Sequence, residues 1–250
     1  MSSIWPVYAG KSFNLWRPDT GDYYDSVDAE AITGHLQEKR KRQNKVKSSA
    51  FAHFDQDHLA DPGTLACLRA RIAFRRVART TDTRTFVCSL IPPRRIATEA
   101  ASYFEQIRGE IRDEAYVLGI LSSMIFDWQL RRVMELTLSF TDLMGTSIAD
   151  PGSGHPVRDR VVEIAGRLAA VDERFEQWAA EVGVPVGSAN DEATKTDLIH
   201  ELDACVAHLY GLDEYDLEVI YTTFDEKRPD RYRDRLAAVL DHFRGLPNSG

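Results

Sequence analysis

The feature that constrains this fold most is a change of pattern across residues 150–156, which read DPGSGHP. Two prolines and two glycines in seven residues interrupt helices and strands alike, so we expect a linker here. Before it, β-prone runs alternate with helical stretches, and after it the pattern is helical and acidic. We therefore predict an α+β (mixed α/β) fold, with a small-sheet body in residues 1–150 and an acidic α-helical region in residues 157–250 packed on it.

Strands are predicted from β-branched and aromatic residues, from apolar alternation, and from nearby turn residues. A polar loop, Thr80-Thr81-Asp82-Thr83, joins two of them, and Pro92-Pro93 ends the second because proline has no amide proton for the ladder. The expected strands are residues 4–8, 13–16, 71–79, 84–91 and 133–140.

Helices are predicted where apolar residues recur every three to four positions. The first begins at Asp28, with Ala29, Ile32 and Leu36 on its apolar face and basic residues at its end, where the helix dipole favours them. A polar stretch, residues 48–63, is expected to be a loop. The other expected helices are residues 116–128, 161–171, 198–209, 213–224 and 231–243.

Composition excludes several classes of protein. Hydrophobic residues make up 43% and charged residues 28%, which is ordinary for a globular chain. Cys67, Cys88 and Cys205 form no CxxC pair, so a disulfide framework or zinc ribbon is not expected, and a reducing cytoplasm suits the count. We find neither an apolar run of about 20 residues nor a secretory signal. The expected location is the cytoplasm, without a membrane partner.

Positive charge is concentrated in one part of the chain. Residues 39–95 hold 14 Lys or Arg and four Asp, a net +10, although the whole chain carries −8. The other 193 residues therefore carry −18. Such segregation is the pattern expected of a nucleic-acid surface attached to an acidic scaffold, although a solvated basic helix followed by a strand with exposed arginines would give the same count.

Catalytic signals are weak. Gly10-Lys11-Ser12 lacks the upstream glycine of a phosphate loop, since that position is Trp5. His53 and His58, with Asp55 and Asp57, could bind a metal ion, but their spacing on a loop favours ordinary solvated residues. Asp225-x-Lys227 resembles half of a nuclease site and follows a helix instead of a strand pair. No Gly-x-Ser-x-Gly elbow or dinucleotide-binding motif is present.

Four stretches in order resemble target-recognition regions of N6-adenine DNA methyltransferases of the type IIG and phage-defence kind. RIAFRRVARTTDTRTFVCSLIPP, from Arg71, resembles their strand–loop–strand with its Arg-Thr pair and closing Pro-Pro. The other three are PVYAGKSFNLWRPDTGDYY, YVLGILSSMIFDWQLRR and LIHELDACVAHLYGLDEYDLEVIYTTF. Together they cover almost the whole chain.

The chain departs from that family in its chemistry. The (Asn/Asp/Ser)-Pro-Pro-(Tyr/Phe) catalytic motif and the S-adenosylmethionine motif are missing, and Pro92-Pro93 lies between Ile91 and Arg94. The resemblance therefore implies sequence-specific target recognition for a restriction–modification or phage-defence system. The implied partners are double-stranded DNA and a methyltransferase subunit or domain that would hold S-adenosylmethionine. No cofactor is expected in this chain.

The implied DNA-binding residues have two roles. Basic residues would hold the phosphate backbone, and the polar loop has the chemistry to read base edges. For Arg84, a fold role such as bonding a neighbouring carbonyl is an equal alternative. The set is Lys39, Arg40, Lys41, Arg42, Lys45, Lys47, Arg75, Arg76, Arg79, Thr80, Thr81, Asp82, Thr83 and Arg84.

Two other functions remain open from the sequence. One is a DNA-processing enzyme, such as a metal-dependent nuclease with an unrecognised active site. The other is an interaction scaffold whose basic segment binds an acidic protein.

Overall fold

Two small sheets form the centre of the molecule in the computed structural model, which describes residues 3–77, 83–134, 137–225 and 232–247. The first sheet has the order β2-β1-β5, with β1 antiparallel to β2 and parallel to β5. The second has the order β4-β3-β6 and is antiparallel throughout. The strands are β1 (Ile4–Tyr8), β2 (Asp25–Asp28), β3 (Arg71–Arg75), β4 (Cys88–Ile91), β5 (Ile96–Ala97) and β6 (Ala101–Tyr103).

The predicted pairing of the segments around residues 71–79 and 84–91 is confirmed as β3 and β4. Ile72 faces Leu90 and Phe74 faces Cys88 across the antiparallel pair. All four side chains are almost fully buried, since one side of this pair packs against α3 (Ile111–Ser122). The β-branched and aromatic residues of this region thus form part of the core.

A separate helical layer lies beyond the first sheet. The predicted helix from Asp28 is confirmed as α1 (Ala29–Gln43), and the Asp28 carboxylate accepts the amide hydrogen bond of Ala31 at 2.8 Å. The stretch expected to be a loop instead contains α2 (Gln56–Ala60). Asp55 begins α2 by accepting from the Asp57 amide, a capping role that the loop interpretation missed.

Two predictions in the middle of the chain are wrong. The single helix expected at 116–128 is two, α3 and α4 (Met124–Arg131), because Ser123 is extended and its Oγ caps the Phe126 amide at 3.1 Å. The described part of the strand expected at 133–140 makes one bridge, Thr137 with Val77, before α5 (Phe140–Met144) begins.

The strand expected at residues 13–16 is also wrong. A 3-10 turn at Gly10–Ser12 precedes it, and Asn14 bridges only to Arg17. The remaining 3-10 turns are Ala50–His53, Pro62–Thr64, Ala66–Leu68 and Glu173–Phe175.

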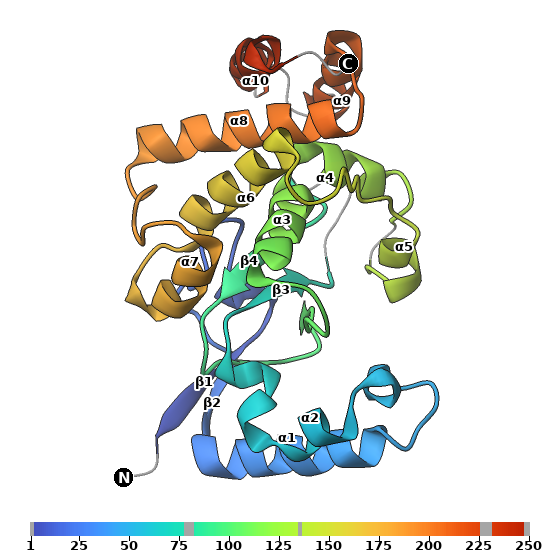
Figure 1. The fold of residues 1–250 in the computed structure, drawn as a ribbon, viewed down its shortest axis with the longest axis vertical. Helices are drawn as coiled ribbons and strands as arrows, with labels where there is room; N and C mark the ends of the chain where they lie inside the picture. Colours follow the sequence, from blue (N-terminus) through green and yellow to red (C-terminus); the bar gives the residue numbers. More distant parts are fainter. Residues whose placement is uncertain (1–2, 78–82, 135–136, 226–231, 248–250) are drawn as a thin grey trace.

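The helical region after the linker is confirmed, with Pro156 as the first residue of its first helix. The last three of these helices, α8, α9 and α10, lie at the end of the molecule opposite α1, whereas α7 lies beside the second sheet (Figure 1). One hydrophobic core joins the two parts of the chain, since α3 packs against α6 and α6 packs against α8. The helices are α6 (Pro156–Ala169), α7 (Glu176–Val182), α8 (Glu192–Leu209), α9 (Glu214–Asp225) and α10 (Arg233–Gly245).

The α+β class with a helical C-terminal region is therefore confirmed. Within the described residues, no helix combines the length and the apolar character needed to span a membrane.

Candidate nucleic-acid interface

Two buried polar side chains attach α1 to the rest of the molecule. The Gln37 amide donates to the carbonyl oxygens of Leu59 and Ala60 at 2.9 and 3.0 Å. The Arg40 guanidinium donates to Thr64 Oγ1 at 2.9 Å and to the carbonyl oxygen of Asp61. Arg40 is only 3% exposed, so it does not belong to a solvent-facing DNA surface, contrary to its place in the predicted set.

The other five predicted basic residues of this segment are exposed. They lie on the last turns of α1 and in the turn that follows, where no acidic residue interrupts them. Lys41 pairs with Glu38 at 3.6 Å, which is a surface ion pair that contributes little. We call Lys39, Lys41, Arg42, Lys45 and Lys47 the basic strip. The hydrogen bonds of Gln37 and Arg40 fix the position of α1, and therefore also the position of the basic residues on its last turns.

Arg75 and Arg76 are half-buried, and the guanidinium group of each already interacts with other residues of the chain. The Arg75 guanidinium donates to the carbonyl oxygen of Phe13. Arg76 forms an ion pair with Glu99 at 2.6 Å, and its guanidinium carbon lies 5.3 Å from the centre of the Phe140 ring. A phosphate could bind Arg76 only in competition with Glu99, whose side chain is largely exposed.

Arg84, which follows the predicted reading loop in the sequence, is buried. Its guanidinium donates to the carbonyl oxygens of Ser122 and Ser123 at 2.6 and 2.9 Å and pairs with Asp127 at 3.2 Å. Asp127 in turn accepts the amide hydrogen bonds of Thr85 and Phe86. Arg84 thus stabilises the fold from the interior and is not exposed to solvent.

Most of the reading loop, namely Thr80, Thr81 and Asp82, lies outside the described residues, and so does Arg79, which was predicted to hold a phosphate. Thr83 is described and exposed, and its carbonyl oxygen accepts from the Tyr232 hydroxyl at 3.1 Å. The base-reading role of this loop stays a prediction.

Two residues of the possible metal site, Asp55 and His58, have local structural roles. Asp55 caps α2, and the His58 ring packs against Phe54 with the ring centres 5.4 Å apart. Across the described ranges, no three His, Cys, Asp or Glu side chains are placed to hold a metal ion.

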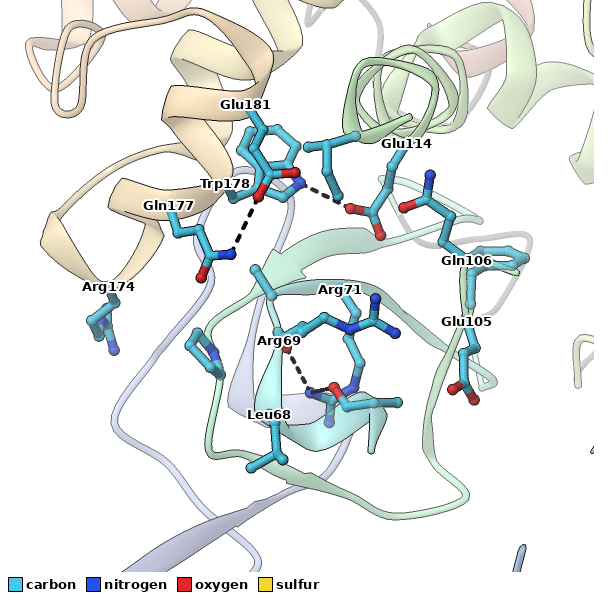
Figure 2. Close-up of a pocket in the computed structure, with 15 residues that line it drawn as sticks. Leu68, Arg69, Arg71, Glu105, Gln106, Glu114, Arg174, Gln177, Trp178 and Glu181 are labelled. Carbon is cyan, nitrogen blue, oxygen red and sulfur yellow. Dashed lines mark hydrogen bonds between the residues drawn. The ribbon is translucent and has the colours of Figure 1, made fainter. Parts of the chain in front are cut away.

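A pocket lies between the β3 region, α3 and α7, and we call it the seam pocket (Figure 2). Glu114 is 9% exposed there, and one of its oxygens accepts from Trp178 Nε1 at 2.8 Å. Burial raises the pKa of the Glu114 carboxyl above its ordinary value. The lining mixes charges of both signs: Arg69, Arg71, Arg174, Glu105, Glu114 and Glu181.

Sequence reasoning missed the seam pocket. In the sequence, Glu114 stands near the start of an apolar helix, where an acidic residue is expected simply because it suits the helix dipole. Its partner Trp178 is 64 positions away, so the local pattern holds no signal for their contact.

No family model matches this chain, and no curated protein and no solved structure matches it either.

Proposed function

We propose that this chain recognises a target sequence in double-stranded DNA for an N6-adenine DNA methyltransferase of a restriction–modification or phage-defence system. The ordered resemblance of four stretches supplies the function class. The catalytic and S-adenosylmethionine motifs would belong to a partner subunit or domain.

The observation that carries the proposal is the basic strip, which lies on the last turns of a fixed helix and in the turn that follows. Lys39, Lys41, Arg42, Lys45 and Lys47 are exposed, while the buried Gln37 and Arg40 use their hydrogen bonds to hold α1 in place. A duplex is a dense line of negative charge, and a protein that neutralises its phosphates releases counterions. A positioned row of cations binds such a polymer without reading its sequence, and base edges then supply specificity.

The double variant Lys41→Gln/Lys45→Gln tests this role. We expect it to weaken binding to every duplex and to reduce the slope of log K against log salt by about 0.9 for each phosphate that the protein no longer neutralises. Fluorescence anisotropy with a labelled duplex at several salt concentrations measures both quantities.

The matched control is Lys195→Gln/Arg244→Gln, which removes the same charge from α8 and α10 at the opposite end of the molecule (Figure 1). Its salt slope should equal that of the wild type. If both variants lose affinity equally, net charge alone drives binding and the basic strip is not the interface.

Sequence specificity needs a second experiment. Selection of a randomised duplex library on the wild-type protein, with and without a methyltransferase partner, should enrich one short motif. If neither selection enriches a motif while binding disappears at high salt, the protein has only a general attraction for phosphate.

A further inference from the structure

A second pocket lies between α1 and the region of β3 and β6. We call it the α1 pocket and use six of its lining residues: Lys39, Arg40, Phe51, Arg71, Tyr103 and Glu105. The basic strip does not explain it, because only Lys39 belongs to both.

Two buried arginines of this pocket make no direct contact with a carboxylate among the described residues. Arg40 is 3% exposed and bonds the Thr64 hydroxyl and the Asp61 carbonyl oxygen. Arg71 is 4% exposed and bonds the carbonyl oxygens of Ala66 and Arg95 at 3.2 and 2.7 Å. In the described part of the chain neither forms an ion pair, and the Nε of each lacks a hydrogen-bond partner. Burying a charge without a counter-charge costs free energy, so an anion in the pocket would be stabilised.

Glu105 offsets only part of this charge. It is the one carboxyl among the described lining residues, and it makes no hydrogen bond or ion pair with the described part of the chain. Burial raises the pKa of Glu105. Lys39 adds a third positive charge, so cations outnumber carboxylates by three to one.

The rest of the lining is flat and apolar. Phe51 and Tyr103 contribute aromatic rings, and the Arg71 guanidinium carbon lies 4.8 Å from the centre of the Tyr103 ring. Leu36, Leu65 and Ile96 complete the apolar wall. Aromatic rings stack on bases of any kind, and cations hold the phosphate beside them.

We propose that the α1 pocket binds one nucleotide, with its phosphate attracted by Lys39, Arg40 and Arg71 and its base against Phe51. The nucleotide could be free in solution or extruded from a duplex, since proteins that act on single bases take them out of the stack. The second source rests on the proposed function, whereas the first does not.

Calorimetric titration with deoxynucleoside 5′-monophosphates, alongside anisotropy with a duplex carrying one unpaired nucleotide, tests the pocket. Glu105→Gln removes a negative charge with little change of shape, so it should tighten binding about five- to tenfold. Phe51→Leu keeps an apolar side chain but removes the ring, and should weaken binding by roughly tenfold.

The matched control is Glu218→Gln, the same change on the exposed surface of α9 at the far end of the molecule (Figure 1). It should bind as the wild type does. If neither ligand binds, or if Glu105→Gln and Glu218→Gln have the same affinity as the wild type, the proposal is overturned.

Two duplexes distinguish the sources of the nucleotide. If the duplex with an unpaired nucleotide binds more tightly than its fully paired counterpart, and Glu105→Gln increases that preference, the pocket takes an extruded nucleotide. If only free monophosphates bind and respond to the variants, the pocket takes a free nucleotide.

The two proposals can fail separately. Fully paired duplex binding that depends on Lys41 and Lys45, with no nucleotide binding in either assay, would leave the proposed function standing and overturn the pocket. Nucleotide binding without any duplex binding would leave the pocket proposal standing and overturn the proposed function.

Discussion

Arg84 brings a positive charge into the interior, where oxygen and sulfur atoms of α3, α4 and the residue between them surround it. Its partner Asp127 is fully buried and also accepts the amide hydrogen bonds of Thr85 and Phe86. The pair therefore ties the start of the β4 segment to the junction of α3 and α4. Arg84 and Thr85 thus stabilise the fold, although their position beside a polar loop in the sequence also suggested a role in DNA binding.

The variant Arg84→Met tests that task. It leaves Asp127 buried without its counter-charge, and we expect the free energy of unfolding to fall by about 3–5 kcal/mol. Urea denaturation followed by circular dichroism measures it. The exposed Lys41→Met is the control and should change stability by less than about 0.5 kcal/mol. An Arg84→Met protein of normal stability with altered sequence preference would instead make Arg84 a base reader.

Glu114 makes stability depend on pH. Burial raises its pKa above the ordinary value of 4.5, although the Trp178 hydrogen bond and the charges of Arg69 and Arg71 act in the opposite direction. The folded protein therefore holds this proton more tightly than the unfolded chain does. The resulting stabilisation is complete below pH 4.5 and is lost as the pH rises through the folded-state pKa.

The variant Glu114→Gln should be about as stable as the wild type below pH 4.5 and more stable at neutral pH. Urea titrations at several pH values measure this difference. Glu218→Gln on the exposed surface should give a difference that does not change with pH. A Glu114→Gln protein whose difference from the wild type is equally flat would contradict the effect of burial.

At the scale of elements, the close approach of α3 and α6 depends on one glycine. A Cβ at Gly119 would lie 2.7 Å from Val161 Cγ1 and 3.3 Å from Ala165 Cβ, both on α6. Gly34 on α1 has nothing within 4 Å of the same position. Two helical glycines of one chain thus differ only in what packs against them.

The variant Gly119→Ala should lower the free energy of unfolding by about 1–3 kcal/mol, because overpacking exceeds the gain in helix propensity. Gly34→Ala should raise it by up to about 1 kcal/mol, since only the propensity changes. Thermal and urea unfolding measure both. Stabilisation by Gly119→Ala would mean that α3 and α6 lie farther apart than the structure has them.

At the scale of the whole molecule, the linker separates two stretches of sequence that share one core. The β-rich part supplies Phe74, Phe86 and α3, and the helical part supplies α6 and α8. Gly152 and Gly154 lie exposed on the connection, with φ of 84° and 83°. Continuity of the chain is thus not what holds the two parts together.

A protease site inserted between Gly152 and Gly154 tests this packing. After cleavage, the two fragments should remain together in size-exclusion chromatography and unfold in one transition, because α3, α6 and α8 bury a common apolar surface. An uncleaved sample of the same variant is the control. Fragments that separate and stay folded would show two independent units.

The sequence by itself determined the elements whose signals lie in local patterns of residues. Apolar spacing and the Asp28 cap located α1, alternation located β3 and β4, and the proline–glycine stretch separated the helical region. Each of these depends on neighbours within a few positions. The same reasoning failed at Ser123, which ends α3 and begins α4, and at residues 133–140, where Ser139 caps the start of α5.

Tertiary structure alone decided which charges face solvent. Lys39 and Arg40 are adjacent in the sequence, yet one is exposed and the other bonds oxygens 21 and 24 positions away. The α1 pocket likewise gathers Phe51, Arg71 and Tyr103 from separate segments. The burial of a charge depends on contacts between distant residues, and a composition count gives the total charge without those contacts.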